Sequence, residues 1–219
     1  MNVFLDIETI PTQSREHAEQ IGASIAPPSS MKKAETIAAW EADEKPKAVA
    51  DAVAKTSFDP AFGHICTIAW AVDNGKIEVA HAPTIGQERD VLSAFFASIP
   101  PDTFAAPTFV GHYIGGFDLR FILCRAVVLG VPIPPQIPRD PKPWDKSVFD
   151  TMSAWAGAKG AISMDKLARA LGLKGKSDFD GSMVAQAWLD GEHDKIADYC
   201  KSDVATTRSI HSRFAAVNW

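Results

Sequence analysis

The sequence is poor in cysteine. Its 219 residues contain three, Cys66, Cys124 and Cys200, and none of them forms a Cys-x-x-Cys pair. Three cysteines cannot all pair with one another, so the sequence argues against a disulfide framework. We therefore expect the protein to reside in a reducing compartment, the cytoplasm.

Long apolar runs are also missing. No stretch approaches the roughly 18 consecutive apolar residues of a membrane span, and a first strand that begins by about residue 2 leaves no room for a secretory signal. We expect a protein with no membrane contact of its own. The composition, 46% hydrophobic and 22% charged, is that of an ordinary globular protein without repeats, so residues 1–219 are expected to form a single domain.

The chain has no overall excess of positive charge. Its net charge of −5 argues against a general nucleic-acid coat. The distribution is uneven, however, because residues 139–176 contain eight Lys or Arg against four Asp or Glu. This segment could track the phosphates of a nucleic-acid strand, and a solvated basic face explains it about equally well. Its candidate contacts are Lys142, Trp144, Lys146, Lys159, Lys166, Arg169, Lys174 and Lys176.

What the sequence does contain is an apolar, β-prone segment with two acids in it, Phe-Leu-Asp-Ile-Glu-Thr-Ile-Pro at residues 4–11. Side chains two residues apart share one face of a strand, so Asp6 and Glu8 lie on the same face as Phe4 and Ile10. Both faces are otherwise apolar, which is typical of a buried strand. Two adjacent buried carboxylates require a positive charge between them. At this point a bound metal and simple exposure of the strand end are both open.

The rest of the chain predicts an α/β domain with a mixed sheet. Residues 12–57, rich in Ala, Lys and Glu, predict a helical arm or insertion with Trp40 as its main apolar anchor. The residues Asp73-Asn74-Gly75 predict the turn of a hairpin. Its strands are expected at 65–72 and 76–80, further strands at 108–112 and 148–151, and helices at 86–99, 118–130, 163–171, 182–190 and 193–217.

Two later motifs contain acids in positions of interest. In Gly-His-Tyr-Ile-Gly-Gly-Phe-Asp, which ends at Asp118, the acid follows a strand and begins a helix. In Tyr-Cys-Lys-Ser-Asp, residues 199–203, the spacing places Tyr199 and Asp203 on one helix face. Each has an ordinary explanation by itself: Asp118 could cap its helix, Tyr199 could be a core aromatic, and Asp203 could be solvated. The ordered set favours one common site.

In order and spacing these motifs resemble those of the DEDD 3′–5′ exonucleases of the ribonuclease H-like fold, tyrosine subclass. The nearest likeness is to the proofreading exonuclease domain of family B DNA polymerases and to stand-alone bacterial and phage relatives. The resemblance covers nearly the whole chain apart from residues 12–57. The histidine subclass has His five residues before its last Asp, where this chain has Asp198. The matching residues are Asp6 and Glu8 of motif one, Phe117-Asp118 of motif two, and Tyr199 and Asp203 of motif three.

This resemblance implies a mixed central β-sheet flanked by helices, with a helical insertion after the first strand. It implies a 3′–5′ exonuclease that hydrolyses single-stranded DNA ends to 5′-mononucleotides with two Mg²⁺ or Mn²⁺ ions, which hard carboxylate ligands suit. Asp6 would bridge both metals, and Asp118 would reach one of them largely through waters. Glu8 and Asp203 would hold the metal that activates water, and Tyr199 would orient that water.

The resemblance also implies substrate contacts. Thr9 and Ile10 would touch the terminal nucleotide, and Phe117 would stack nearby or belong to the core. Relatives usually carry Asn where this chain has Tyr113, a departure that leaves the acids intact and puts the substrate contacts in doubt. For Asp150 we favour a structural role at a strand end.

Three further expectations complete the sequence analysis. His112, His193 and His211 have no ligand spacing and are treated as non-catalytic. The same chemistry on RNA 3′ ends is an alternative, because contacts to a ribose hydroxyl leave no mark in the sequence. A catalytically idle nucleic-acid-binding module is the other, but its signature would be a lost carboxylate, and none is lost.

Overall fold

The computed structural model describes residues 1–99, 106–142, 145–157, 159–175 and 178–219. Trp144 and Lys176, two of the predicted contacts to a nucleic-acid strand, therefore lie outside the described residues. Within this part of the chain, five strands form one mixed sheet in the order β3-β2-β1-β4-β5. The strands are β1 (Asn2–Ile10), β2 (His64–Val72), β3 (Glu78–His81), β4 (Thr108–Gly111) and β5 (Val148–Asp150).

The central strand, β1, is buried on both faces. It pairs antiparallel with β2 and parallel with β4. Val3, Leu5 and Ile7 belong to a core with α4 and α5, whereas Phe4 packs against Cys200 and Val204 of α9. Cys200 also contacts Asp6, so the even-numbered face that carries Asp6 and Glu8 looks toward α9. The predicted alternation along this strand is confirmed.

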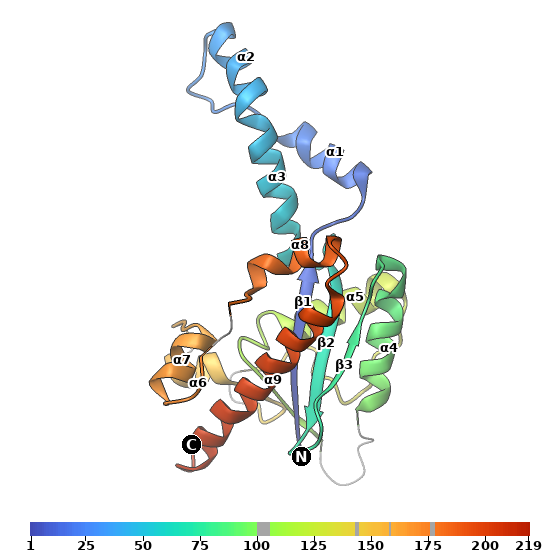
Figure 1. The fold of residues 1–219 in the computed structure, drawn as a ribbon, viewed down its shortest axis with the longest axis vertical. Coiled ribbons are helices and arrows are strands. Elements are labelled where there is room, and N and C mark those ends of the chain that lie inside the picture. Colours follow the sequence, from blue (N-terminus) through green and yellow to red (C-terminus); the bar gives the residue numbers. More distant parts are fainter. Residues whose placement is uncertain (100–105, 143–144, 158, 176–177) are drawn as a thin grey trace.

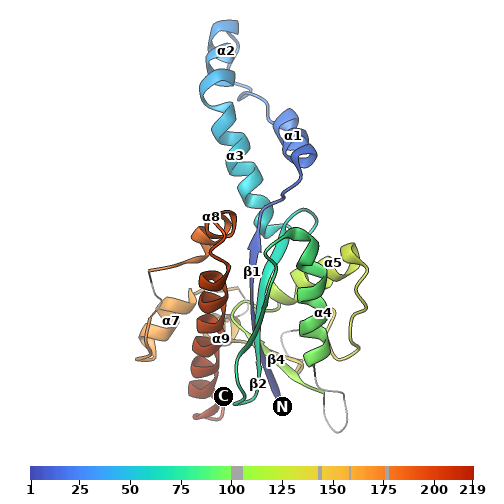
Figure 2. The same cartoon turned by 45° about the vertical axis from the view of Figure 1, so that its right-hand side comes forward.

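Helices cover both faces of the sheet (Figure 2). The long helix α9 crosses one face, where it contacts β1 and β2, and α4 and α5 lie on the other. Two short helices, α6 and α7, pack beside the C-terminal half of α9 (Figure 1). The helices are α4 (Glu88–Ser98), α5 (Asp118–Leu129), α6 (Thr151–Ala156), α7 (Met164–Ala170), α8 (Val184–Leu189) and α9 (His193–Ala215).

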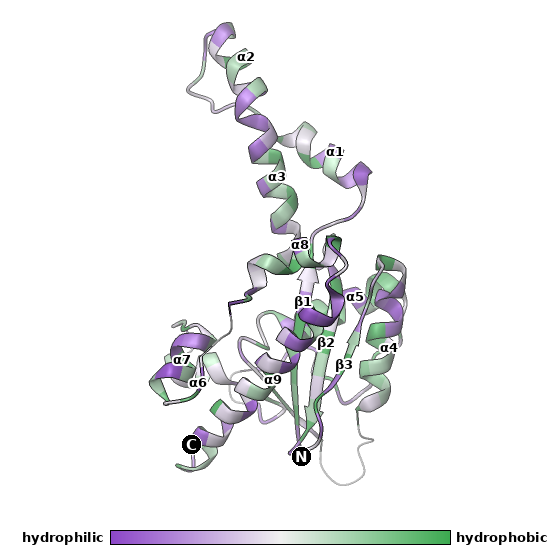
Figure 3. Cartoon of the chain, in the orientation of Figure 1, coloured by the Kyte–Doolittle hydropathy of each residue, from purple (hydrophilic) through white to green (hydrophobic). Residues whose placement is uncertain are grey.

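The predicted helical arm between the first two strands is present. It consists of α1 (Arg15–Ser24), α2 (Ala34–Asp43) and α3 (Lys45–Lys55), and it projects away from the sheet beyond the end of β1 (Figure 1). None of the three helices contains a buried residue, and the expected anchor Trp40 is partly exposed. Hydrophilic and hydrophobic residues alternate along the arm (Figure 3). The arm therefore adds no buried core of its own.

The other element boundaries differ little from those predicted. The hairpin turn follows β2, with Asp73 at a φ of 46° and the N–H of Gly75 donating to the carbonyl of Val72. The second hairpin strand begins at Glu78 instead of Lys76. The helix expected at 182–190 begins as a 3₁₀ turn at Gly181–Met183 and continues as α8. Among the described residues, no helix combines the length and the apolar character that crossing a bilayer requires.

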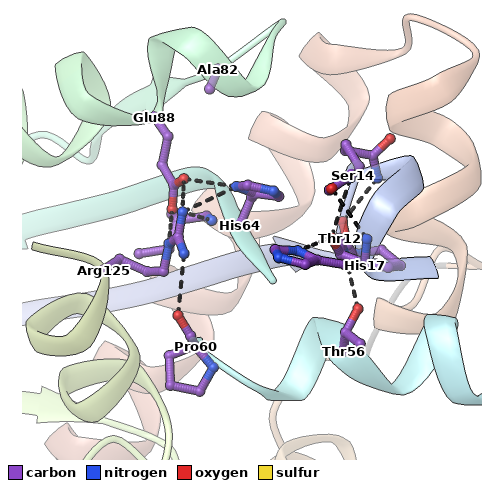
Figure 4. Close-up of polar contacts among 12 residues, drawn as sticks. Thr12, Ser14, His17, Thr56, Pro60, His64, Ala82, Glu88 and Arg125 are labelled. Carbon is purple, nitrogen blue, oxygen red and sulfur yellow. Dashed lines mark hydrogen bonds and ion pairs between the residues drawn. The ribbon is translucent and has the colours of Figure 1, made fainter. Parts of the chain in front are cut away.

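A buried ion pair joins the helices on the α4 face to the sheet (Figure 4). The guanidinium of Arg125 donates two hydrogen bonds of 2.7 Å to the carboxylate of Glu88 and one of 3.2 Å to the carbonyl of Pro60. Glu88 also contacts His64 and accepts the N–H of Ile65. Burial by itself would raise the pKa of Glu88, but these hydrogen bonds outweigh burial and hold the pKa below its usual value. The pair thus ties α4, α5 and the start of β2 together.

We expect Arg125→Met to lower the free energy of unfolding by about 3–5 kcal/mol, because it leaves the Glu88 carboxylate buried without its cation. The double variant Glu88→Leu, Arg125→Met removes the charge as well and should recover most of the loss. Urea unfolding measures both. Arg15→Met serves as the control, since its pair with Glu19 is exposed. A double variant no more stable than Arg125→Met would contradict this explanation.

Candidate active site

Among the described residues, the second half of β1 has no strand partner on the β4 side. The parallel pairing covers Asn2, Val3 and Phe4 only, because β4 ends at Gly111. Farther along, the N–H of Ile7 donates instead to Oδ1 of Asp118 at 3.2 Å. Asp118 is the first residue of α5 and 4% exposed. Its carboxylate therefore lies against the strand between Asp6 and Glu8.

The helix α9 brings the third motif to the same place. Tyr199 and Asp203 are 7% and 5% exposed, respectively. The hydroxyl of Tyr199 hydrogen-bonds with Asp203, and its ring packs edge-on against Phe179 with 5.1 Å between centroids. The neighbouring Cys200 donates its thiol hydrogen to the carbonyl and to Oδ2 of Asp6, at 3.3 and 3.4 Å. The i, i+4 pair and the first strand are thus in direct contact through this helix face.

The carboxylates share one electrostatic environment. Burial raises the pKa of Asp6 well above its usual range, and the charges of three neighbouring acids raise it further: Glu8, Asp118 and Asp203. Burial is also the main reason that the pKa of Asp118 rises to about 7, with the N–H of Ile7 opposing the rise. The pKa of the Tyr199 hydroxyl is raised by burial and by the charges of three of these acids. The structure therefore brings all five predicted site residues together.

The donors at this site fit a hard divalent cation. Asp6, Glu8 and Cys200 offer ligand atoms that lie within 4.8 Å of one another. Burial and the charge of Asp6 raise the pKa of the Cys200 thiol well above its usual value, so it remains protonated and acts as a hydrogen-bond donor. The anionic donors are then carboxylate oxygens, which select Mg²⁺ or Mn²⁺ over softer metals.

Two cysteines support the site, and sequence reasoning missed both. Cys66 of β2 donates to the backbone carbonyl of Glu8 at 3.4 Å, just as Cys200 donates to that of Asp6. The only signal in the sequence was the position of Cys200 between Tyr199 and Asp203. Cysteine spacing is informative about disulfides and metal sites, whereas a thiol that supports a strand depends on which elements pack together.

Ile10 and Thr9, two predicted substrate contacts, have contacts within the protein. Ile10 is 1% exposed and packs in a cluster with Phe179 and Tyr199, so its side chain presents no surface to a substrate. The side chain has a packing role, because α8 and α9 cover this end of the face that it shares with Glu8. Its contact with the terminal nucleotide stays a prediction. Thr9 is half-buried, and its hydroxyl donates to the carbonyl of Ser57 at 2.7 Å.

A groove of about 540 Å³ opens beside the carboxylates. Phe117, another predicted contact, lies on its wall, half-buried and in contact with the rings of Phe58 and Phe121. Glu8 and Thr9 line the same groove. A second cleft, of about 360 Å³, is lined by Tyr113, Asp150, Lys142, Phe149, Ser153 and Trp219.

Asp150 has the structural role that was favoured from the sequence. It caps α6, where Oδ1 accepts the N–H groups of Met152 and Ser153 at 3.0 and 3.3 Å. The same oxygen accepts the N–H of Tyr113 at 2.9 Å. His112 bonds Thr151 and the carbonyl of Ile162 through its two ring nitrogens, which anchors this loop.

The described cations of the basic segment lie on the surface. Lys142 pairs with Asp140, and Arg169 pairs with Asp165 at 3.0 Å. Lys142 also lines the second cleft. The contact of these cations with a nucleic-acid strand stays a prediction. The exposed members are Arg139, Lys142, Lys146, Lys159, Lys166, Arg169 and Lys174.

Tyr113 adopts a strained backbone conformation. Its φ of 65° lies in the left-handed region, which Gly and Asn adopt more readily than an aromatic residue. The loop holds it there, because the carbonyl of Tyr113 accepts the N–H groups of Gly116 and Phe117 while its own N–H is bound by Asp150. A side chain on Gly116 would overlap with the tyrosine ring. The motif therefore forms a tight turn in which tyrosine is the residue under strain.

We expect Tyr113→Asn to raise the free energy of unfolding by about 1 kcal/mol, since Asn adopts this backbone conformation at lower cost. The Tyr113 side chain is 48% exposed, so little packing is lost. Urea unfolding provides the measurement, and Tyr113→Phe, which keeps both ring and strain, should match the wild type. A Tyr113→Asn protein less stable than Tyr113→Phe would contradict the assignment of strain.

The comparisons with known proteins agree with this geometry. Residues 57–218 match the family described as "Predicted 3'-5' exonuclease related to the exonuclease domain of PolB". A similar solved structure is the family B DNA polymerase from the hyperthermophilic archaeon Pyrobaculum calidifontis, with 21% sequence identity and a TM-score of 0.56. The match covers 72% of this chain and 22% of the polymerase chain. Comparison with curated proteins finds no significant match.

At this identity the polymerase structure establishes the fold alone. The mixed five-stranded sheet with helices on both faces is the ribonuclease H-like fold expected from the motifs. The matched segment contains motifs two and three, and the structure adds Asp6 and Glu8 from the preceding strand. The chain belongs to the family of predicted 3′–5′ exonucleases related to the exonuclease domain of PolB.

Proposed function

We propose that this protein is a metal-dependent 3′–5′ exonuclease that hydrolyses single-stranded DNA ends to 5′-mononucleotides. The observation that carries the proposal is the convergence of four acids from three separate elements on one buried site, with Tyr199 beside them. A nucleic-acid substrate follows from the family. Single-stranded DNA is the specific choice, and the groove next to Glu8 supports it.

Exonuclease domains of this type use divalent metals, and we propose two Mg²⁺ or Mn²⁺ ions here. Asp6, Glu8, Asp118 and Asp203 would hold them. When bound, the ions would neutralise charge on the phosphate and lower the pKa of the attacking water. The raised pKa values of Asp6 and Asp118 support this assignment, because burial first and neighbouring acids second raise them, and a bound cation would stabilise the charged carboxylates.

The other groups of the site keep the acids oriented and supply a proton donor. The N–H of Ile7 orients Asp118, and the thiol of Cys200 orients Asp6. A tyrosine hydroxyl is protonated at neutral pH, and burial and the neighbouring acids raise the pKa of Tyr199 further, so we propose that it donates a hydrogen bond to the attacking water. This role supports membership of the tyrosine subclass.

We expect Asp203→Ala to lower kcat on a 5′-labelled DNA oligonucleotide by more than about a hundredfold. The matched control is Asp198→Ala, five residues earlier in the same helix, because Asp198 is exposed and paired with Lys201. Asp6→Ala should behave as Asp203→Ala does, and Tyr199→Phe should lower kcat while the metal concentration for half-maximal rate changes little. Gel separation of the products shows the direction of digestion.

Three results would overturn the proposal: activity that survives EDTA, shortening from the 5′ end, or equal activity in Asp203→Ala and Asp198→Ala. A matched RNA oligonucleotide tests the choice of substrate. If RNA is digested faster than DNA, the substrate of the same site is RNA.

We also predict how metal removal affects stability. Folding raises the pKa of Asp118 from 3.8 to about 7, so its contribution to stability is complete below the lower value and is lost as the pH rises through the higher one. In EDTA the melting temperature of the wild type should therefore fall between about pH 4 and about pH 7. Asp118→Asn, which keeps the acceptor for Ile7, should show a shallower fall. The exposed Asp43→Asn is the control, and equal slopes in Asp118→Asn and wild type would contradict the prediction.

A further inference from the structure

The root of the helical arm forms one wall of the groove beside the acids. Glu8 and Thr9 of β1 line the groove, and so does Phe117. The arm side consists of the end of α3 and the 3₁₀ turn Thr56–Phe58 that follows it. Part of this wall, including Lys55, precedes the segment 57–218 that matches the exonuclease family. The arm side therefore includes residues that the family match does not cover.

The most prominent residue of this wall is Phe58. Its side chain is 72% exposed, which is high for a large aromatic residue. Its ring lies 6.3 Å from that of Phe117 at an interplanar angle of 57°, so one edge is supported while much of the ring faces solvent. Lys55, also exposed, lines the same groove three residues earlier. An exposed aromatic ring and a cation thus line the same groove as Glu8.

Several hydrogen bonds hold this turn against the end of β1. The hydroxyl of Thr9, the residue after Glu8, donates to the carbonyl of Ser57 at 2.7 Å. The N–H of Thr12 donates to the hydroxyl of Thr56 at 2.8 Å (Figure 4). A side chain at Gly63 would overlap with the carbonyl of Thr56, so the strand into β2 passes close beneath the turn. The position of Phe58 relative to Glu8 is thereby set by backbone contacts.

We propose that Phe58 is the platform on which a base near the 3′ end of the single strand stacks, and that Lys55 contacts a backbone phosphate of the same strand. The inference rests on the proposed exonuclease function. A strand whose end reaches Glu8 continues into this groove, because Glu8 lines it. Stacking accepts every base, as an exonuclease that removes successive nucleotides requires. A platform fixed before binding also avoids the entropy cost of ordering a loop.

The first experiment combines substitutions of Phe58 with the removal of single bases from the substrate. Wild type, Phe58→Ala and Phe58→Trp digest oligonucleotides that carry an abasic residue at one of the 3′-terminal positions. In the wild type, the abasic residue at the stacked position should raise KM about tenfold. Phe58→Ala should raise the KM of the intact oligonucleotide by a similar factor and be insensitive to the abasic residue, while Phe58→Trp keeps the wild-type pattern.

Phe62→Ala is the matched control for Phe58→Ala. Phe62 is 40% exposed, packs on His17 and does not line the groove. Its KM should equal that of the wild type. Because Phe58 is exposed, the melting temperature of Phe58→Ala should stay close to that of the wild type, which separates a binding effect from misfolding.

The second experiment tests Lys55 without catalysis. Fluorescence anisotropy in EDTA measures the binding of a fluorescein-labelled oligothymidylate at several salt concentrations. Lys55→Gln should reduce the slope of log affinity against log salt by about 0.7, the value for one lost contact to a single strand. Lys47→Gln is the control, since Lys47 lies on the arm and pairs with Glu44 outside the groove. Its slope should equal that of the wild type.

The outcomes separate this inference from the proposed function. A wild type that digests no oligonucleotide refutes the proposed exonuclease function. A wild type that digests DNA from the 3′ end, together with an unchanged KM in Phe58→Ala or unchanged sensitivity to the abasic residue, refutes the stacking platform alone. Equal salt slopes in Lys55→Gln and Lys47→Gln refute the phosphate contact.

Discussion

Electrostatic repulsion among four gathered carboxylates is the constraint on which the rest of the structure depends. The acids come from β1, α5 and α9, and each element is fixed by contacts that do not involve the acids themselves. The bidentate pair of Glu88 with Arg125 locks α4 and α5 to the sheet, and α9 is held by a long apolar face. The scaffold can therefore hold together charges that would otherwise separate. Bound cations relieve the repulsion that remains, so the unrelieved repulsion favours cation binding.

Local hydrogen bonds complete this arrangement where β1 loses its parallel partner. Beyond Phe4 one edge of the strand has no neighbouring strand, and this exposes a backbone donor to which Asp118 can bind. On the α9 side, Cys200 supplies a small buried donor that adds no charge. A lysine in its place would neutralise the acids and compete with a metal, whereas a protonated thiol orients Asp6 and leaves its charge intact.

Periodicity made the main features predictable from the sequence. The period of two placed Asp6 and Glu8 on one strand face, and the i, i+4 spacing placed Tyr199 and Asp203 on one helix face. Those rules describe one element at a time, so they could not show which neighbour covers a side chain. Ile10 shares the face of Glu8 and yet is buried, because α8 and α9 reach that end of the strand. The thiol contacts and the position of the arm's root likewise depend on packing between distant segments.

The groove beside Glu8 and the second cleft both present aromatic side chains. On one side, Tyr113 occupies a turn whose left-handed backbone would suit an asparagine, an amide able to hydrogen-bond a substrate. On the other, Phe58 extends from the turn at the arm's root. Aromatic faces bind bases by stacking, which depends little on base identity, whereas amides discriminate by hydrogen bonds. The combination favours an exonuclease that accepts any terminal nucleotide.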